Sequence, residues 1–536
     1  MPTSPQDSRL TAMLTPAVDP EWTLTRLTPP SRLFGANGLR TGPDGRIYVA
    51  QVTGSQISAL DVTSGELGVV SARGGDVVAP DDVAFDSSGT LYATEVMDAR
   101  VSALDASGRA RVLRDDLPCA NGITVYQDRL FVGECREGGR LMELDRATGA
   151  RRILAEHLPS PNAMEVGPDG LLYFPVMTAN EIWRIDPFAA DAAPQRVAGD
   201  LGVPDSVKFD ADGFIVSTQA ASGQVLRVDP RTGAATVLAQ LQPGLDNCTF
   251  ADGRLFVSNF TGEITEIGGG GATSTVLPGG LNWPLDLTVD GAGTLYVADG
   301  TYFYAVSADG RLETLGMLFS PGYPGFVRGV TAIGPGEFVV TTSGGQVARY
   351  LPAQSSSEVL ADGFDQLYGV AVGSAGIAVT EFGTGRVLRV RGGAAEVLAQ
   401  DLAGPVGIVN ADDGTHLVAE SGAGRVVRVS GSGVQTVVDD LVRPQGIALA
   451  GRTLYIVDAG TRQVLAVDLD AGTRQVLADG LPIGPPPGVT PKPLNGMPPF
   501  SGPQGPFAGI ARGRAGTLFV AADGDGSVLA LHPVGP

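Results

Sequence analysis

Six side chains that carry oxygen donors occur at matching places of a repeated pattern in the first half of the chain. Each copy consists of a strand-like stretch, a turn that contains glycine and a second strand-like stretch, as in PDDVAFDSSGTLYATE at residues 80–95. The first stretch of successive copies opens with an Asn or an Asp, at Asn37, Asp81, Asn121, Asn162, Asp205 and Asp246. Hard divalent cations bind about six to eight oxygens from such side chains and from water. If the fold brings these six positions together, they predict a metal site.

The second half repeats the pattern without these oxygen donors. The same register there holds Leu285, Arg328, Tyr368, Val406, Gln445 and Ala508. Asn and Asp that served only to start strands should occur in both halves, because both halves share the same turn chemistry. Three carboxylates that converge on one axis would repel one another unless a cation lay between them. We therefore predict a divalent metal in the first half, with Ca²⁺ as the best fit, Mg²⁺ or Mn²⁺ as alternatives, and zinc disfavoured because it prefers His and Cys. A solvated polar channel mouth is the competing interpretation.

The elements that must position these side chains form about twelve copies of a unit of roughly 40 residues. A third strand, such as QVLRVDPRTG (224–233), and a fourth, such as TVLAQL (236–241), follow each pair. Four antiparallel strands per unit are typical of a β-propeller blade, whose first strand lines the central channel. Rings usually hold about four to eight blades. We therefore predict an all-β fold of two tandem six-bladed β-propellers, that is, twelve four-stranded blades, with a single twelve-bladed ring as the alternative.

Glycine-rich and unpaired stretches predict the domain boundaries. We expect a flexible tail at residues 1–19, a first propeller at 20–267, a glycine linker at 268–271 and a second propeller at 272–536. EWTLTRLTPP (21–30) resembles a fourth strand with no blade before it, and a similar strand follows the linker. Each is expected to complete the last blade of its own ring, which closes the circle and removes an open edge. The Pro/Gly-rich residues 482–506 predict an extended loop, which either covers one end of the second ring or is an idle surface excursion.

Three strand openings in consecutive copies point to a family. They are ANGITV (120–125) with Asn121, PNAMEVGPDG (161–170) with Asn162, and PDSVKFD (204–210) with Asp205. In this order of ligands, residues 20–267 resemble the six-bladed propellers of the regucalcin/gluconolactonase family and its relatives, the diisopropylfluorophosphatases and paraoxonases. Asn37 departs from the pattern, because the family has a Glu in the first blade. The whole chain also resembles, more loosely, the NHL-type and streptogramin-lyase propellers.

The resemblance implies an enzyme, a metal-dependent hydrolase that acts on a lactone, ester or phosphoester. A channel cation would act as a Lewis acid, and a nearby carboxylate would act as the base. Asp205 is the first candidate for this base. Glu95 and Glu134, at the ends of second strands, are further candidates unless they are solvated strand ends. The missing first-blade Glu argues against ordinary gluconolactonase activity, so a lyase or cyclase of natural-product biosynthesis on the same metal scaffold, or a non-catalytic ligand-binding propeller, are the alternatives.

The second half offers a different kind of site. VTEFGTGRVLRV (379–390) resembles a strand pair of the streptogramin lyases, with Glu381 at their Glu position, although the His of those enzymes has no evident counterpart in this half. Arg328, Tyr368 and Gln445 open first strands. Together these four residues predict a site for an anionic or polar organic ligand, and a degenerate ring that only scaffolds is the alternative.

Composition disfavours several classes of partner and mechanism. The formal net charge of −21 at pH 7 disfavours nucleic acid and anionic membranes, since both require basic surfaces. No apolar run is long enough to span a bilayer, and the first residues lack the pattern of a signal peptide. Three cysteines provide no disulfide framework, and three histidines without a G-x-S-x-G motif argue against a serine nucleophile. We expect a cytoplasmic protein whose partner is a small-molecule substrate; the sequence indicates no oligomeric state.

Overall fold

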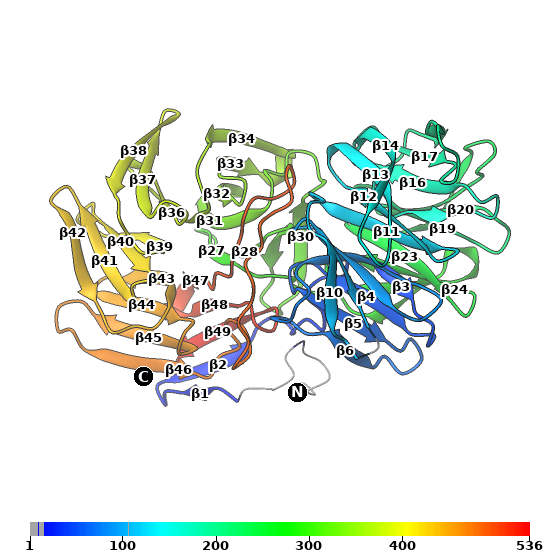
Figure 1. Cartoon of the computed structure of the whole chain (residues 1–536). Coiled ribbons are helices and arrows are strands. Elements are labelled where there is room, and N and C mark those ends of the chain that lie inside the picture. Colours follow the sequence, from blue (N-terminus) through cyan, green and yellow to red (C-terminus); the bar gives the residue numbers. More distant parts are fainter. Residues whose placement is uncertain (1–8, 10–14, 106, 536) are drawn as a thin grey trace. The chain divides into compact units, whose positions relative to one another are not determined.

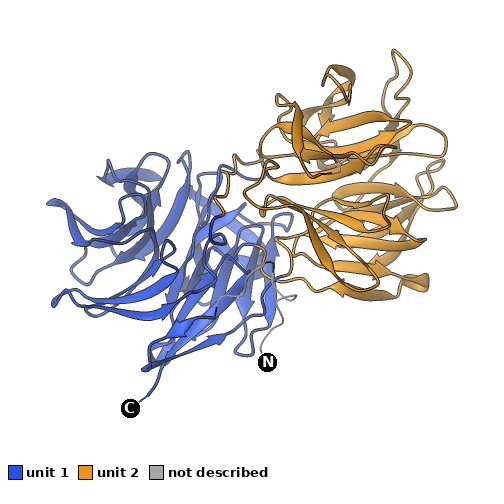
Figure 2. Ribbon diagram, turned by 60° about the horizontal axis from the view of Figure 1, so that its bottom comes forward, with its two compact units in different colours: residues 1–31, 283–488, 499–536 blue, residues 32–282, 489–498 orange. Residues whose placement is uncertain are grey.

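The computed structural model of the chain describes residues 9, 15–105 and 107–535. These residues form antiparallel strands almost throughout, because short runs of β-branched and aromatic residues alternate with glycine-containing turns. Twelve sheets result, and the predicted all-β fold of six-bladed propellers is confirmed (Figure 1). The chain forms two compact units (Figure 2). We call the unit of residues 32–282 and 489–498 the first propeller, and the unit of residues up to 31, 283–488 and 499–536 the second propeller.

The first propeller has six blades, each made of four strands in chain order. Blades one and two contain β3 (Leu39–Thr41), β4 (Ile47–Gln51), β5 (Gln56–Leu60) and β6 (Leu67–Ser71), then β7 (Pro80–Phe85), β8 (Leu91–Glu95), β9 (Arg100–Leu104) and β10 (Ala110–Arg114). Blades three and four contain β11 (Ala120–Tyr126), β12 (Arg129–Glu134), β13 (Glu137–Leu144) and β14 (Arg151–Pro159), then β15 (Glu165–Val166), β16 (Leu172–Val176), the 3-10 helix η2 (Met177–Ala179), β17 (Glu181–Ile185) and β18 (Gln195–Ala198). Blades five and six contain β19 (Pro204–Phe209), β20 (Ile215–Gln219), β21 (Gln224–Val228) and β22 (Ala235–Gln240), then β23 (Leu245–Ala251), β24 (Arg254–Asn259), β25 (Ile264–Ile267), η3 (Gly269–Gly271) and β26 (Thr273–Leu277).

The second propeller also has six blades, and two of them include strands from the N-terminal segment. Blades one and two contain β27 (Asp286–Val289), β28 (Leu295–Asp299), β29 (Tyr302–Val306) and β30 (Leu312–Met317), then β31 (Val327–Gly334), β32 (Glu337–Thr342), β33 (Val347–Leu351), η4 (Pro352–Gln354) and β34 (Ser356–Ala361). Blades three and four contain β35 (Leu367–Gly373), β36 (Gly376–Glu381), β37 (Arg386–Arg391) and β38 (Ala394–Ala399), then β39 (Pro405–Asn410), β40 (His416–Glu420), β41 (Arg425–Ser430) and β42 (Gly433–Val438). Blade five contains β43 (Pro444–Ala450), β44 (Thr453–Asp458), β45 (Gln463–Asp468), β46 (Arg474–Asp479) and β1 (Ala17–Val18), and blade six contains β47 (Ile510–Arg512), η5 (Arg514–Gly516), β48 (Leu518–Ala522), β49 (Ser527–Pro533) and β2 (Trp22–Arg26).

The predicted linker at residues 268–271 is wrong, because these glycines form a turn within one blade. β25 and β26 pair with Ile267 opposite Thr273, and η3 lies between them. Gly270 and Gly271 have φ values of 70° and 80°, which glycine adopts without steric cost. The first propeller therefore extends to residue 282 instead of 267. A run of glycines suits a linker and a turn equally well, so the pattern alone did not separate the two.

The strand at residues 21–30 completes a different ring from the one predicted. β2 pairs with β49, with Leu24 opposite Leu531, in the last blade of the second propeller. The last blade of the first propeller has β26 as its own fourth strand and does not need β2. The first propeller closes by side-chain packing instead, since Phe256 of blade six packs in one cluster with Leu39 and Ile47 of blade one.

The predicted flexible tail at residues 1–19 lies partly outside the described residues. Its described part is bound to the second propeller, contrary to the prediction. β1 pairs with β46, with Ala17 opposite Asp479, and Arg9 Nη2 donates to the carbonyl oxygen of Asp523 at 2.6 Å.

The Pro/Gly-rich residues 482–506 are divided between the two units. Residues 489–498 belong to the first propeller, where Asn495 Nδ2 donates to Asp98 Oδ1 at 3.1 Å. Residues 499–506 belong to the second propeller, where the backbone N–H of Gly502 donates to Ser343 Oγ at 3.1 Å. The loop is therefore held by specific contacts rather than being an idle surface excursion.

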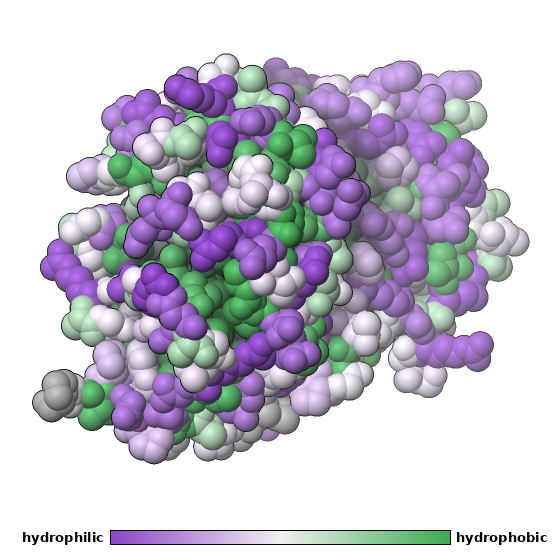
Figure 3. Space-filling view, turned by 90° about the vertical axis from the view of Figure 1, so that its left-hand side faces the viewer, coloured by the Kyte–Doolittle hydropathy of each residue, from purple (hydrophilic) through white to green (hydrophobic). Residues whose placement is uncertain are grey.

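Neighbouring blades pack through their apolar faces, whereas the outer strands face solvent. Tyr48 and Ile57 of blade one, for example, pack against Val83 of blade two. The outer strands of the second propeller are exposed over much of their length, and several of them carry an exposed valine: Val359, Val397, Val434 and Val476. Polar and apolar side chains are accordingly interspersed on the face shown in Figure 3. Among the described residues, no helix has the length and apolar character needed to cross a membrane.

Candidate functional site

The six predicted ligand positions lie at the starts of the six first strands of the first propeller. Asp81, Asn121, Asp205 and Asp246 are among the first two residues of β7, β11, β19 and β23, and Asn37 and Asn162 shortly precede β3 and β15. At this point β7, β11, β19 and β23 each show a shift in register against the second strand. A β-bulge of this kind bends a strand and re-aims its side chains. We call the six side chains the mouth ring.

The residue after a mouth position lies where neighbouring first strands nearly touch. A Cβ added to Gly122 would lie 2.3 Å from the carbonyl oxygen of Asn162, and one added to Gly38 would lie 2.5 Å from that of Asp81. These distances leave no room for a side chain. The second propeller has glycine at the corresponding position in five blades: Gly329, Gly369, Gly407, Gly446 and Gly509. Asn121-Gly122 therefore opens a strand because the bulge turns Asn121 and the backbone of the next blade requires glycine.

The three carboxylates of the mouth ring are buried, and burial together with neighbouring carboxylates raises the pKa of each. Burial, followed by the charge of Asp82, raises the pKa of Asp81 to about 8. Burial, followed by the charges of Asp81 and Asp82, raises the pKa of Asp205 well above its ordinary value. Burial and the charges of Asp205 and Asp81 do the same to the pKa of Asp246. A cation at this place would favour the ionised carboxylates instead.

The three amides of the mouth ring differ in how far their oxygens are used. Asn121 Oδ1 is buried and has no hydrogen-bond partner among the described residues. Asn162 Oδ1 accepts from the backbone N–H of Ala163 at 2.8 Å. Asn37 Oδ1 accepts from the backbone N–H of Val52 at 3.2 Å. Asn121 is thus the amide whose oxygen is free for a ligand.

Carboxylates alone do not make a metal site here. Among the described residues, no three His, Cys, Asp or Glu side chains meet closely enough to hold a metal ion. Asp81 starts blade two, and Asp205 and Asp246 start blades five and six, so amides separate Asp81 from the other two carboxylates, which are in neighbouring blades. A cation in this ring would need Asn oxygens and water as well as Asp oxygens.

A second layer of charged side chains occurs further along the first strands, and the sequence analysis missed it. Arg40 Nη1 pairs with Glu165 Oε2 at 2.6 Å, and Lys208 Nζ lies 3.7 Å from the same oxygen. Asp82 accepts a hydrogen bond from Asn247 Nδ2 at 3.3 Å. Arg40, Glu165 and Lys208 each stand three positions after a mouth residue. Extending the comparison of first strands by those three positions would have found them.

This second layer is electrostatically balanced, unlike the mouth ring. Partial burial acts to raise the pKa of Glu165, but the charges of Arg40 and Lys208 outweigh it and lower the pKa below its usual value. Burial, followed by the charge of Arg40, lowers the pKa of Lys208. Burial raises the pKa of Asp82 despite the charges of Lys208 and Arg40. The ion pairs can therefore persist without any bound ligand, whereas the three carboxylates of the mouth ring form no salt bridge within the described part of the chain.

Glu95 and Glu134 are fully buried rather than solvated strand ends. Glu95 Oε2 accepts from the backbone N–H of Val78 at 2.5 Å and pairs with Arg100. Glu134 Oε2 accepts from Arg140 Nε at 2.9 Å. The same backbone contact as that of Glu95 recurs at other ends of second strands: Gln51, Gln219, Asp299, Glu381, Glu420 and Asp458. This recurrence gives Glu95 a structural function, which is to hold the segment before the first strand of its blade.

Two of the four predicted ligand residues of the second propeller lie in direct contact. The guanidinium carbon of Arg328 lies 4.0 Å from the centroid of the Tyr368 ring, and both side chains are buried. Gln445 is buried at the start of β43. Glu381 is instead paired with Arg386 Nε at 2.6 Å. Arg328, Tyr368 and Gln445 thus remain as candidates for ligand contact.

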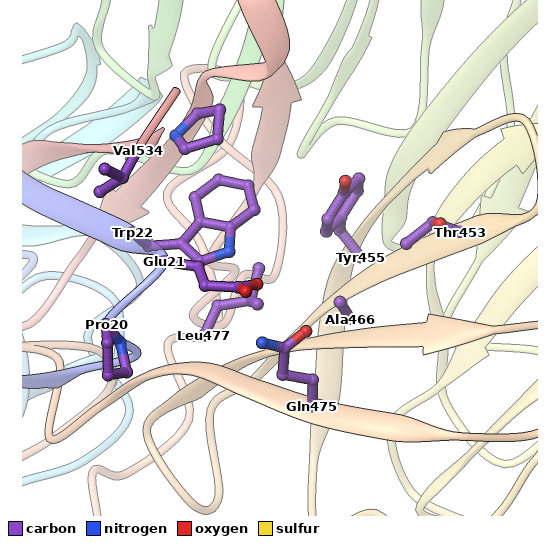
Figure 4. A pocket seen from close by; sticks show the side chains of 10 residues that line it. Pro20, Glu21, Trp22, Thr453, Tyr455, Ala466, Gln475, Leu477 and Val534 are labelled. Carbon is purple, nitrogen blue, oxygen red and sulfur yellow. The ribbon is translucent and has the colours of Figure 1, made fainter. Parts of the chain in front are cut away.

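An open groove lies between β2 and β44–β46 of the second propeller (Figure 4). Its volume is about 590 Å³, and Trp22 and Tyr455 line it with ring centroids 6.4 Å apart. Gln475 Nε2, also in the lining, donates to Asp19 Oδ2 at 3.0 Å. None of the predicted site residues lines this groove, so it does not alter the choice of site.

Comparison with known proteins finds likeness among solved structures. No family model and no curated protein matches the chain. A streptogramin B lyase is 17% identical over 52% of this chain and 94% of its own, with a TM-score of 0.39. Virginiamycin B lyase from Staphylococcus aureus is 16% identical over 52% and 96%, with a TM-score of 0.38. A gluconolactonase from Xanthomonas campestris is 17% identical over 46% and 91%, with a TM-score of 0.38. These are the two kinds of protein that the sequence resembles, but likeness at this level says nothing of activity.

Proposed function

We propose that the first propeller binds a divalent cation in its mouth ring and, with it, hydrolyses a lactone, ester or phosphoester of a small molecule. Ca²⁺ is the proposed cation, with Mg²⁺ or Mn²⁺ as alternatives, since all three take oxygen ligands. The observation that carries the proposal is Asn121 Oδ1, a buried acceptor without a partner among the described residues, in the same ring as three buried carboxylates.

The donor set of the mouth ring fits such a cation. Leaving a buried acceptor unsatisfied costs about 1–3 kcal/mol, and like charges add to the cost. A cation held by Asp81, Asn121, Asp205 and Asp246 would offset both costs. The amide oxygen of Asn162 keeps a second lone pair and could complete the set with water.

Asn37 supports the site indirectly, although it stands where the resembling family has Glu. Asn37 Nδ2 donates to Asp246 Oδ2 at 3.0 Å. This hydrogen bond orients the carboxylate of the neighbouring blade. In this proposal Asp246 therefore supplies the charge that the first blade lacks.

A bound cation of this kind supplies a Lewis acid for a carbonyl or phosphoryl oxygen. Asp205 is the proposed base that takes the proton from the attacking water. It is buried in the mouth ring, and a cation there would favour its ionised form, which is the form that accepts a proton. Glu95 and Glu134 are less suitable, because arginines already neutralise their carboxylates.

Elemental analysis of the desalted, untagged protein tests the site directly. We expect about one calcium or similar ion per chain, by analogy with single channel sites of oxygen ligands. Asp205→Ala and Asn121→Ala should lose most of it. Asp286→Asn is the matched control, because Asp286 occupies the corresponding first strand of the second propeller and its pKa is also raised, to about 7. This control should keep the ion.

A panel of lactones, aryl esters and phosphotriesters then tests the reaction. Activity should disappear with a chelator and return with CaCl₂. Incorporation of oxygen from labelled water into the product is expected for a hydrolase and excludes a lyase or cyclase. If the wild-type protein binds no divalent ion even after dialysis against CaCl₂, the proposal is wrong.

A further inference from the structure

Arg328 places a positive charge inside the second propeller without a carboxylate beside it. Its side chain is 1% exposed. Nη2 donates to the carbonyl oxygen of Gly505 at 2.8 Å, and the guanidinium lies over the ring of Tyr368. Among the described residues, no Asp or Glu forms a salt bridge with Arg328. A buried charge without a counter-charge is costly, so the arrangement calls for an anion.

The same place contains further polar atoms that lack a partner. Nε and Nη1 of Arg328 are buried and have no acceptor among the described residues. Gln504, the residue before Gly505, is 4% exposed, and both its amide nitrogen and its amide oxygen are without a partner. Each unsatisfied buried group costs about 1–3 kcal/mol. Gln504 directly precedes the residue that Arg328 contacts, and the two side chains offer donors and an acceptor that no other described residue uses.

The segment of residues 501–508 contains Gln504 and is held in place at three points. Gly502 N–H donates to Ser343 Oγ at 3.1 Å, and Ala508 N–H donates to Gln445 Oε1 at 2.8 Å. The third point is the hydrogen bond between Arg328 and Gly505. A Cβ on Gly505 would lie 2.9 Å from the hydroxyl oxygen of Tyr368, so this segment approaches the channel residues closely.

The chemistry of the enclosing residues selects the class of ligand. A single guanidinium balances one negative charge, and the chain as a whole carries −21, so a monoanion fits better than a dianion such as phosphate. Phe507 packs on Tyr368 with ring centroids 5.9 Å apart and provides an apolar wall. The amide of Gln504 can both donate to and accept from a hydroxyl or amino group.

We propose that the second propeller binds a small monocarboxylate beneath residues 501–508, with Arg328 on the carboxylate and Gln504 on a neighbouring hydroxyl or amino group of the ligand. This site is separate from the metal site of the first propeller. The loop segment forms its cover, and ligand exchange requires the three tethering hydrogen bonds to open.

Titration calorimetry and thermal unfolding with acetate, glycolate and inorganic phosphate test this proposal at constant ionic strength. Acetate and glycolate should bind the full-length wild-type protein and raise its Tm, and glycolate should bind more tightly because its hydroxyl engages Gln504. Arg328→Met should weaken both at least about tenfold, the loss expected for a hydrogen bond to a charged group. Arg349→Met is the matched control, since Arg349 pairs with Glu337 in the next strand of the same blade, and it should bind as the wild type does.

Gln504→Leu keeps the buried charge of Arg328 and tests the site even if Arg328→Met does not fold. This variant should bind acetate as the wild type does and lose the preference for glycolate. Equal binding of phosphate and the carboxylates would overturn the assignment to monocarboxylates. The site itself would be overturned if none of the three probes bound, or if binding were unchanged in both variants. Water molecules would then be the hydrogen-bond partners of the free polar atoms of Arg328 and Gln504.

Discussion

The carboxylates of the mouth ring predict that the metal-free protein loses stability as the pH rises. The pKa of Asp81 rises from 3.8 to about 8 in the folded chain, because of burial and the charge of Asp82. Between these pH values the folded protein keeps a proton that the unfolded chain releases, so the free energy of unfolding falls with increasing pH. The penalty is absent below about pH 4 and complete above about pH 8. At 1.36 kcal/mol per pKa unit, a shift of about four units costs about 5–6 kcal/mol at the upper end.

Asp81→Asn removes the titrating group while keeping its size. With chelator present, we expect the variant to exceed the wild type in free energy of unfolding by several kcal/mol at pH 8 and by less than about 2 kcal/mol at pH 5. CaCl₂ should stabilise the wild type at pH 8 and the variant much less, because a ligand that binds only the folded state stabilises it. Urea unfolding followed by the fluorescence of Trp183, which lies in the first propeller, measures these differences.

The matched control is Asp252→Asn, which removes an exposed carboxylate of the same propeller. It should change the free energy of unfolding little at either pH. The reasoning is refuted if the metal-free wild type is equally stable at pH 5 and pH 8. It is also refuted if Asp81→Asn lowers the stability by the same amount at both.

Three further predictions concern packing and ion pairs. Gly122→Ala should destabilise the protein by about 1–3 kcal/mol in urea unfolding, because its Cβ would collide with the backbone of the next blade. Gly269→Ala, with open space around it, should have little effect. A larger loss of stability in Gly269→Ala than in Gly122→Ala would contradict the close approach of the backbones at Gly122. Arg40→Met should cost about 3–5 kcal/mol because it leaves Glu165 without its main partner, and the double variant with Glu165→Met should recover part of this loss in thermal unfolding. Glu134→Gln should lower Tm but leave the metal content per folded chain unchanged, whereas loss of metal would assign this residue to the site.

The repeat made much of the fold predictable, and the parts that failed have physical reasons. Alternating apolar residues and glycine turns repeat in every blade, so the blades and their first strands could be counted from the sequence. The partner of β2 could not be predicted. A fourth strand pairs with a third strand that has no fourth strand of its own, and which blade lacks its fourth strand depends on strands far away in the chain. The turn at residues 268–271 failed because glycine suits turns and linkers alike.

One residue of the candidate site could be predicted from the sequence in each blade of the first propeller. The mouth positions could be aligned because each lies at a fixed place before a turn. Arg40, Glu165 and Lys208 lie deeper in the same strands and were missed, since a charged residue within a strand usually faces solvent. The free oxygen of Asn121 and the unpaired atoms of Arg328 depend on the positions of neighbouring side chains, which no spacing rule contains.

The pairing of β2 with β49 also has a consequence for the order in which the protein is synthesised. Translation produces β2 before any other part of the last blade, and its partner only some 500 residues later. Until then β2 carries unpaired backbone groups, which are a template for pairing with other chains. Strands β3–β26 leave the ribosome in the interval and can form complete blades, because none of them waits for β2. The second propeller, by contrast, closes only after residues 527–533 are made, so a stalled or shortened chain would carry one closed ring and one ring with an open edge.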